Sequence, residues 1–142
     1  MTIARITSAR STTEIISCDV STPVREAVAI LAGKRIGALP VLDNGKIAGI
    51  FSERDVIYRL ADDGAACLDK TVGEVMTSPP ITVEPSTKID DALSLMTKRR
   101  FRHFPVVEDG ALIDFISIGD MVKIKMDEVE QEAEALRTYI AT

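Results

Sequence analysis

The chain has 142 residues, of which 46% are hydrophobic and 27% charged, a size and composition that support one folded domain with a buried core. Its net charge is −5, but residues 127–142 carry five acids against one arginine, so the remainder is almost neutral and poorly suited to binding nucleic acid through its phosphates. No run approaches the roughly 18 apolar residues of a membrane-spanning helix, so we expect no membrane partner.

Residues 1–12 lack the continuous apolar stretch of a secretory signal, and we expect them to form an unstructured tail. The two cysteines, Cys18 and Cys67, have neither the spacing of a metal site nor the number needed for a disulfide framework. Together these features favour a cytoplasmic protein.

The sequence of residues 13–69 predicts five secondary-structure elements in the order β-α-β-β-α. Thr22-Pro23 is typical of an N-cap followed by proline in the first helical turn, and the apolar residues after it recur at helical spacing. The dipeptide Asn44-Gly45 predicts a tight hairpin between two apolar runs. The expected elements are strands at 15–18, 38–42 and 47–51 and helices that begin near residues 23 and 52.

Residues 70–123 repeat this order behind a short helical connector at Thr71–Met76, which the prolines after Ser78 terminate. Thr87 repeats the N-cap, and Asp109-Gly110 repeats the hairpin signal. The expected elements are strands at 81–83, 104–107 and 112–116 and helices that begin near residues 87 and 117.

The two units are copies of one another. Residues 15–58 align without a gap with residues 80–123, at a displacement of 65 residues, and 10 of the 44 pairs are identical. Many of the other pairs exchange one apolar residue for another. Because a unit of about 45 residues is too small to bury a core alone, we expect the two to pack together.

Residues 124–142 extend the last helix beyond the repeat as an amphipathic segment. Apolar residues follow a heptad-like spacing of 4, 3, 4, 3 and 4, with acids on the opposite face. This apolar stripe consists of Val122, Met126, Val129, Ala133, Leu136 and Ile140. It could pack against its own domain or contact a second subunit, and we favour the second subunit.

A Ser-x-x-Asp motif closes each unit, at residues 52–55 and 117–120. A serine N-cap with an acid in the first helical turn explains either copy alone. The motif recurs directly after the third strand of both units, however, and basic residues precede the second strand of each. A carboxylate accepts hydrogen bonds from a ribose diol, while a helix N-terminus and a guanidinium bind phosphate. The combination therefore indicates a nucleotide site.

Catalytic machinery is not indicated. His103 is the single histidine, and the sequence has neither a G-x-x-x-x-G-K-[ST] phosphate loop nor a G-x-G-x-x-G motif. We therefore expect no enzyme, no metal site and no catalytic cofactor. Lys98 and Arg99 are expected to be solvated, whereas Arg102 and His103 stand next to a strand and are better candidates for ligand contacts.

The sequence resembles the tandem cystathionine-β-synthase (CBS) domain pair over about residues 13–123. The resemblance rests on the ungapped repeat, on IGALPVLDNGKIAGIFSERD at 36–55, on VGEVMT at 72–77 and on FRHFPVVEDGALIDFISIGD at 101–120. Together these motifs are similar to those of the stand-alone, single-pair members found in bacteria and organelles. The resemblance implies an α+β fold in which two β-α-β-β-α repeats pack through their sheets about a pseudo-two-fold axis and leave two clefts. It also implies a homodimer, since pairs of this family commonly dimerise.

The resemblance further implies a ligand and the residues that bind it. Family members bind AMP, ADP, ATP and, in some cases, NAD(H) or S-adenosylmethionine. By matching position, the aspartates would bind ribose, the serines ribose or phosphate, apolar strand residues the adenine, and two arginines the phosphate. The expected ligand-binding residues are Ile16, Gly37, Ala38, Leu39, Ile50, Ser52, Arg54, Asp55, Ile81, Arg102, His103, Phe104, Phe115, Ser117, Gly119 and Asp120.

The two clefts are not expected to be equivalent. Gly49 of the first unit corresponds to Asp114, which could narrow or acidify the edge of the second cleft, and Gly37 corresponds to Arg102. The first cleft would thus offer Arg54 from its helix, and the second Arg102 from its strand. We predict that both accept an adenine nucleotide, with unequal affinity.

Three functions can be compared. The favoured one is a regulatory module that binds adenosine-containing nucleotides and signals their occupancy through a homodimer or an unknown partner protein. The alternative is a structural dimerisation adaptor with no bound nucleotide, against which both Ser-Asp pairs argue. A nucleic-acid binder built on residues 98–103 is the weakest hypothesis, because Phe101 is the one suitable aromatic residue in that patch and the chain has no basic excess.

Overall fold

The computed structural model describes residues 1–10 and 14–141. The first repeat contains β1 (Cys18–Asp19), α2 (Val24–Lys34), β2 (Ala38–Asp43), β3 (Lys46–Ser52) and α3 (Glu53–Asp63). A 3₁₀ helix, η1 (Gly64–Asp69), and the short helix α4 (Val72–Val75) lead to the second repeat, which contains α5 (Ile89–Arg99), β4 (His103–Glu108), β5 (Ala111–Ser117) and α6 (Ile118–Ala141). Helix α1 (Ala4–Ala9) precedes both repeats.

The two hairpins, β2-β3 and β4-β5, are antiparallel and share their irregularities. The turn residues have positive φ angles, 51° and 80° at Asn44-Gly45 and 51° and 81° at Asp109-Gly110, as a type I′ turn requires. The register shifts after Val41 in one hairpin and after Val106 in the other, at positions that the displacement of 65 residues relates. The hairpins predicted from the Asn-Gly and Asp-Gly dipeptides are confirmed.

The first strand of each unit is shorter than the sequence predicts. β1 pairs in parallel with β2 over residues 18–19 alone, and in the second unit Val83 forms an isolated bridge to Val106. The described sheets therefore have the orders β1-β2-β3 and β4-β5. Ile16 and Ile81, which precede the paired residues, line the cavities described below.

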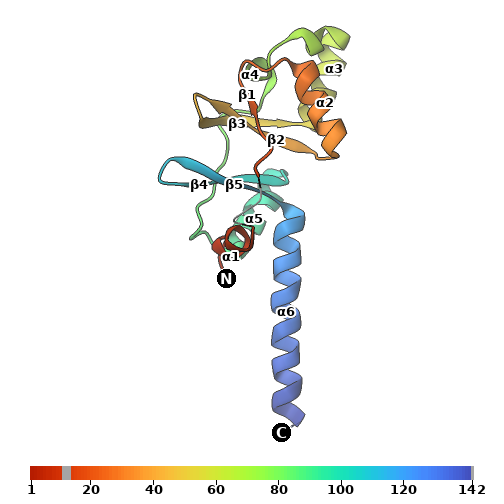
Figure 1. Ribbon diagram of the computed structural model, residues 1–142. Coiled ribbons are helices and arrows are strands. Elements are labelled where there is room, and N and C mark those ends of the chain that lie inside the picture. Colours follow the sequence, from red (N-terminus) through yellow and green to blue (C-terminus); the bar gives the residue numbers. More distant parts are fainter. Residues whose placement is uncertain (11–13, 142) are drawn as a thin grey trace.

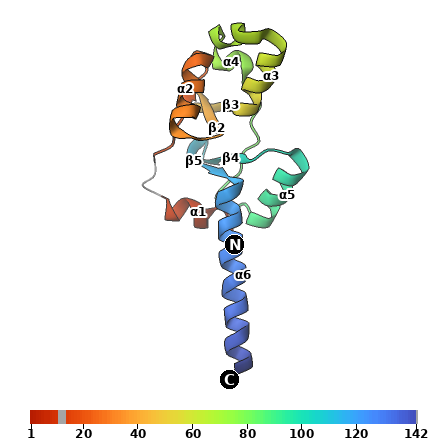
Figure 2. The same cartoon turned by 90° about the vertical axis from the view of Figure 1, so that its right-hand side faces the viewer.

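The two sheets lie face to face between two layers of helices (Figure 1). Helices α2 and α3 cover the outer side of the first sheet, while α1 and α5 lie beyond the second sheet, on either side of the start of α6 (Figure 2). Strands β3 and β5 contact each other across the two sheets. The repeats thus pack together, as their small size predicts.

Each repeat has its own core, and a helical segment from outside the repeat completes it. The core of the first repeat includes Val72 and Val75 of α4. The core of the second repeat includes Ile3 and Ile6, from the segment that contains α1. The connector therefore packs on the repeat before it, and the N-terminal segment crosses over to the more distant second repeat.

Thr22 and Thr87, expected to be N-caps, instead form hydrogen bonds with the connector and with the N-terminal segment. Helices α2 and α5 have no side-chain cap. The carbonyl oxygen of Thr22 accepts a hydrogen bond from Val72 N (2.8 Å), and that of Thr87 accepts one from Ile3 N (2.9 Å). Each threonine hydroxyl accepts from the backbone N–H three residues earlier. The N-cap prediction is wrong because these side chains stabilise the turn before the helix.

The expectation of an unstructured tail is wrong for the described part of residues 1–12. Residues 4–9 are helical, Ile3 is fully buried and Ile6 is 3% exposed. The segment TIARI at 2–6 corresponds to TVGEV at 71–75, at a displacement of 69 residues instead of 65. Four additional residues therefore separate the N-terminal segment from its following repeat, and a gapless comparison does not reveal the match.

Helix α6 runs from the second Ser-x-x-Asp motif far beyond the body of the molecule, as the sequence predicts (Figure 1). Its apolar stripe is exposed, with 58% of Met126, 60% of Leu136 and 74% of Ile140 accessible to solvent. These residues do not pack against their own domain, so a contact with a second subunit stays the prediction for the stripe. Among the described residues, no helix combines the length and apolar character needed to cross a membrane.

We expect Ile3→Ala to lower the free energy of unfolding by about 2–5 kcal/mol, because it leaves a cavity in the second core. Denaturant titration followed by circular dichroism measures this loss. Ile57→Ala, at a side chain that is 62% exposed, is the control and should change stability by less than about 0.5 kcal/mol. Equal stabilities of the Ile3→Ala and wild-type proteins would mean that the N-terminal segment is not part of the core.

Candidate functional site: two clefts between the repeats

A cavity of about 540 Å³, here named the first cleft, opens between the repeats at the start of α3. The first repeat contributes the Ser-x-x-Asp motif and Ile50 of β3, and the second contributes residues 99–103, from the end of α5 to the start of β4. The segment that follows the connector adds Thr77, Pro79, Pro80 and Ile81. The volume falls within the range of about 300–1,000 Å³ that is typical of small-molecule sites.

A capping box holds Asp55 on the wall of the first cleft. Asp55 Oδ2 accepts hydrogen bonds from Ser52 N (2.8 Å) and Ser52 Oγ (3.1 Å), and Asp55 N donates to Ser52 Oγ (3.3 Å). Asp55 Oδ1 accepts from the Thr77 hydroxyl (3.0 Å). The capping interpretation of the motif is confirmed. It is compatible with ligand binding, because hydroxyl groups of a ligand can replace those of Ser52 and Thr77 while the backbone N–H holds the carboxylate.

Arginine side chains surround the first cleft. Its lining includes Arg54, Arg99, Arg100 and Arg102, against the carboxylates of Glu53 and Asp55. Arg54 Nη1 donates to the carbonyl oxygen of Arg100 (2.8 Å), so this side chain spans the two repeats. Guanidinium groups form strong, charge-assisted hydrogen bonds with phosphate. The first cleft is therefore chemically suited to an anionic ligand.

A second cavity of about 400 Å³, here named the second cleft, lies at the start of α6. Its wall contains Phe115, Ser117 and Asp120 of the second repeat, Ile15, Ile16, Ile36 and Ala38 of the first, and Arg10, Glu14, His103 and Asp114. Ala38 and His103 occupy equivalent positions in the two repeats and line both clefts. The clefts are therefore related by the repeat and meet at this pair of residues.

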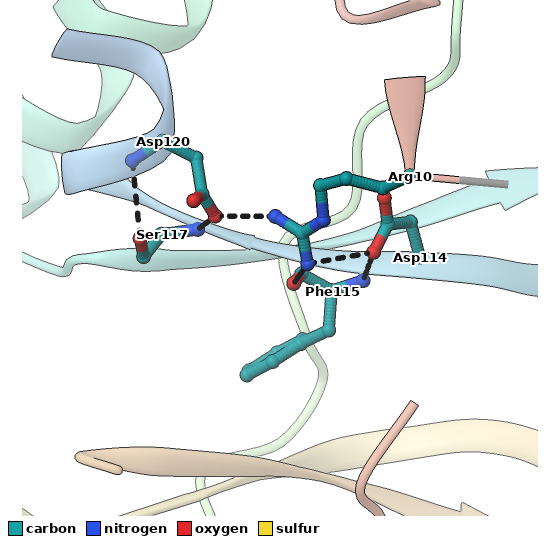
Figure 3. Close-up of polar contacts among 5 residues, drawn as sticks. All are labelled: Arg10, Asp114, Phe115, Ser117 and Asp120. Carbon is teal, nitrogen blue, oxygen red and sulfur yellow. Dashed lines mark hydrogen bonds and ion pairs between the residues drawn. The ribbon is translucent and has the colours of Figure 1, made fainter. Parts of the chain in front are cut away.

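Arg10, directly after α1, reaches into the second cleft between two carboxylates (Figure 3). Its Nη1 donates to Asp120 Oδ2 (2.7 Å), and its Nη2 donates to Asp114 Oδ1 (3.3 Å) and to the Phe115 carbonyl oxygen (3.4 Å). Asp120 Oδ2 also accepts from Ser117 N (2.8 Å). Burial by itself raises the pKa of Asp120, but the hydrogen bonds from Ser117 and Arg10 outweigh it and hold the pKa below its usual value. Asp120 is therefore ionised in the folded protein.

Gly49 of the first repeat and Asp114 of the second occupy equivalent positions but have different neighbours. The connector lies against Gly49, and Arg10 of the N-terminal segment lies against Asp114. A Cβ atom at Gly49 would lie 2.7 Å from both Thr77 O and Met76 Sδ, because the connector pairs closely with β3 there. In the second repeat a side chain occupies this position, since Asp114 is 6% exposed and pairs with Arg10. Asp114 lines the second cleft, where it adds a negative charge as the sequence predicts.

His103 is the titratable group that the two clefts share. Its ring stacks on Phe115, with centroids 5.3 Å apart and an interplanar angle of 11°. Burial lowers the pKa of His103, and the charge of Arg102 lowers it further, against the opposing charges of Asp120 and Glu53. The imidazole is therefore mainly neutral at pH 7 and offers a flat, uncharged face.

Most of the expected ligand-binding residues line a cleft. The first cleft contains Gly37, Ala38, Ile50, Ser52, Arg54, Asp55, Ile81, Arg102 and His103. The second contains Ile16, Ala38, His103, Phe115, Ser117 and Asp120. That these residues bind a ligand stays a prediction.

Three expected residues line neither cleft. Leu39 and Phe104 are fully buried in the two cores, because side chains alternate along a strand and these point away from Ala38 and His103. Gly119 lies in the first turn of α6 and contributes no surface to the second cleft. We therefore no longer assign ligand contacts to these three side chains.

Three arginines line the clefts in ways that the sequence does not predict. Arg102 lines the first cleft instead of the second, because each cleft combines the Ser-x-x-Asp motif of one repeat with the strand start of the other. Arg99 is exposed, as predicted, and in addition lines the first cleft. Arg10 is missed altogether. The one available signal for it is the similarity of residues 2–6 to residues 71–75, which requires a gap of four residues.

The described ranges contain no group of three or more His, Cys, Asp or Glu side chains arranged to hold a metal ion. Cys18 and Cys67 are buried and form no disulfide. Burial, with the charges of Asp19 and Glu26, raises the pKa of the Cys18 thiol to about 11. This thiol is therefore protonated and a poor nucleophile or ligand at neutral pH.

The family model of the CBS domain matches the chain twice, at residues 6–62 and 72–127. Together with the two β-α-β-β-α units, these matches show that the chain belongs to the CBS domain family and contains a tandem pair. The α+β fold implied by the resemblance is confirmed.

Relatives of known name and structure support the assignment. The mitochondrial CBS domain-containing protein CBSX3 of Arabidopsis thaliana is 37% identical over 128 residues, a match that covers 87% of this chain and 62% of that protein. The chain thus spans less than two thirds of this relative. A solved signal-transduction protein with CBS domains from Burkholderia ambifaria, described as putative, is 39% identical with a TM-score of 0.82, over 89% of this chain and 95% of that one.

Two similar solved structures contain adenosine compounds. CBSX2, solved in complex with AMP, is 30% identical with a TM-score of 0.74, over 89% of this chain and 96% of that one. The CBS domain pair of protein MJ0100, solved with 5′-methylthioadenosine and S-adenosyl-L-methionine, is 25% identical with a TM-score of 0.76, over 90% of this chain and 98% of that one.

We expect the pKa of His103 to lie below its usual value of about 6.5, because burial disfavours the charged ring. NMR titration of the ring protons measures it without ambiguity, since the chain has one histidine. The unfolded chain then binds a proton that the folded chain does not, so stability should fall as the pH falls through about 6.5. A measured pKa above the usual value would contradict the buried position.

Proposed function

We propose that this CBS domain pair is a non-catalytic regulatory module that binds adenosine-containing ligands in its two clefts. Occupancy is signalled through a homodimer or a partner protein. The observation that carries the proposal is the placement of Asp55 and Asp120. Each carboxylate is held by the backbone N–H of its motif serine, at 2.8 Å, on the wall of a cavity of ligand size.

The two aspartates are suited to a ribose diol. An ionised carboxylate has about four acceptor sites, and the serine backbone N–H occupies one of them. At Asp55 the remaining partners are the hydroxyl groups of Ser52 and Thr77, which the hydroxyl groups of a ligand can replace. At Asp120 the remaining partner is the guanidinium of Arg10, which can give way to a ribose hydroxyl while it keeps its bond to Asp114. Because the acceptor is oriented before the ligand arrives, binding requires little ordering of the site.

Apolar side chains beside each aspartate are suited to adenine. In the first cleft Ile50, Ile81 and Phe101 line the wall, and in the second Ile16 and Phe115 do so. A flat base between such residues buries apolar surface without leaving polar groups of the protein unpaired. The complexes of CBSX2 with AMP and of the MJ0100 pair with 5′-methylthioadenosine and S-adenosyl-L-methionine support this class of ligand.

Phosphorylated ligands are proposed for the first cleft in particular. The arginines that line it, with Arg54 tied to the carbonyl of Arg100, are suited to AMP, ADP, ATP or the diphosphate of NAD(H). Sensing of cellular energy state is the corresponding role. A signal requires that the ligand bind one conformation or assembly more tightly than another, since equal affinities shift no equilibrium.

The apolar stripe of α6 supports a homodimer. Its heptad-like spacing and its exposure in the single chain are the properties of a helix that packs against another helix. The alternative function, a dimerisation adaptor with empty clefts, would use the same stripe but needs neither carboxylate. The cytoplasmic location inferred from the sequence stays a prediction, and the relative CBSX3 is named as mitochondrial.

We expect the wild-type protein to bind AMP in calorimetric titration and the double variant Asp55→Ala/Asp120→Ala to bind at least about tenfold more weakly. Each lost hydrogen bond to a charged acceptor costs about 1.5–3 kcal/mol. Asp62→Ala removes the same charge from an exposed position on α3 and should leave the affinity unchanged. If a folded wild-type protein binds none of AMP, ADP, ATP, NADH and S-adenosylmethionine, the adaptor hypothesis replaces the proposal.

We expect Val129→Glu to convert a dimer into a monomer, because it buries a charge in the apolar contact between two copies of α6. Sedimentation equilibrium measures the mass. Gln131→Glu, which adds the same charge on the polar face of α6, is the matched control and should stay dimeric. A dimer that survives Val129→Glu would show that the stripe is not the dimer interface.

A further inference from the structure

We propose that the two clefts select opposite ligand charges: the first takes phosphorylated adenosine compounds, and the second takes phosphate-free ones that are uncharged or cationic. This inference rests on the proposed function and divides its ligands between the two sites. It differs from the expectation that both clefts accept an adenine nucleotide.

The linings of the two clefts differ in charge. Four arginines face two carboxylates in the first cleft. In the second, one arginine faces three carboxylates, those of Glu14, Asp114 and Asp120. His103 belongs to both linings and does not offset this difference, because its ring is mainly neutral at pH 7. A phosphate is thus attracted to the first cleft and repelled from the second.

The single arginine of the second cleft is already engaged. Arg10 bonds to Asp120 at 2.7 Å and to Asp114 at 3.3 Å, and Figure 3 shows its guanidinium between the two carboxylates. A phosphate that recruited Arg10 would leave the buried carboxylate of Asp114 without its cation. Leaving a buried charge unpaired is strongly unfavourable, so Arg10 cannot serve as a phosphate anchor at little cost.

Two charged residues of the second cleft, Arg10 and Asp114, have no charged counterpart in the first repeat or its connector. Arg10 lies between the N-terminal TIARI segment and the first repeat, in a stretch that is four residues longer than its counterpart after α4. Asp114 replaces Gly49, a position that the first repeat keeps without a side chain because the connector passes there. The charge difference therefore comes from the arginines of the first cleft and from Arg10 and Asp114 of the second, while both clefts contain the same Ser-x-x-Asp motif.

AMP and adenosine differ only by the phosphate, so their relative affinities test this inference directly. Asp120→Ala leaves the first cleft intact, and we expect it to bind AMP at least about tenfold more tightly than adenosine. Asp55→Ala leaves the second cleft intact, and we expect it to bind adenosine and S-adenosylmethionine at least about tenfold more tightly than AMP. Asp55→Asn, which keeps an acceptor for Ser52 N, serves if the alanine variant does not fold.

A second substitution isolates the charge. In the Asp55→Ala background, Asp114→Asn should shift the preference toward AMP by about three- to tenfold, because it removes one buried negative charge from the second cleft. Asp109→Asn makes the same change in the exposed hairpin turn and should shift nothing. A second cleft that prefers AMP, or an Asp114→Asn substitution without effect, overturns this inference alone. A wild-type protein that binds neither compound overturns the proposed function as well.

Discussion

Neither repeat completes its hydrophobic core with its own residues, so each core takes in a helical segment from outside the repeat. The paths of these two segments also shape the clefts. The connector helix α4 completes the first core and the N-terminal segment with α1 completes the second. The chain that follows each of these helices runs along the edge of a cleft. Side chains from these stretches, Thr77 and Arg10, bond to the aspartates of the two motifs. Core packing thus determines which groups meet a ligand.

The paths of the same two segments make a duplicated protein chemically asymmetric. The connector passes so close to β3 that Gly49 cannot carry a side chain without displacing backbone, whereas Asp114 stands at the equivalent position of β5. A buried carboxylate requires a cation, and Arg10 supplies it from the N-terminal segment. The second cleft is therefore rich in carboxylates, while arginines of the repeats themselves line the first.

The Ser-x-x-Asp motif joins stability and binding in one set of hydrogen bonds. Its capping box satisfies N–H groups at the start of α3, and the equivalent bonds between Ser117 and Asp120 do so at the start of α6. The bonds that start the helix also orient the carboxylate toward the cavity. A carboxylate held in this way needs no rearrangement of the backbone to accept a ribose hydroxyl, which favours binding.

Local patterns were sufficient to predict the hairpins, the amphipathic helices, the duplication and the Ser-x-x-Asp motif, because turn chemistry and side-chain periodicity act over a few residues. They were not sufficient for Arg10, which lies 104 and 110 residues from the two aspartates it binds. Nor could they assign Arg102 to the first cleft, since each cleft combines the motif of one repeat with the strand start of the other. Those pairings follow from the packing of the repeats against each other, a long-range arrangement that local spacing does not encode.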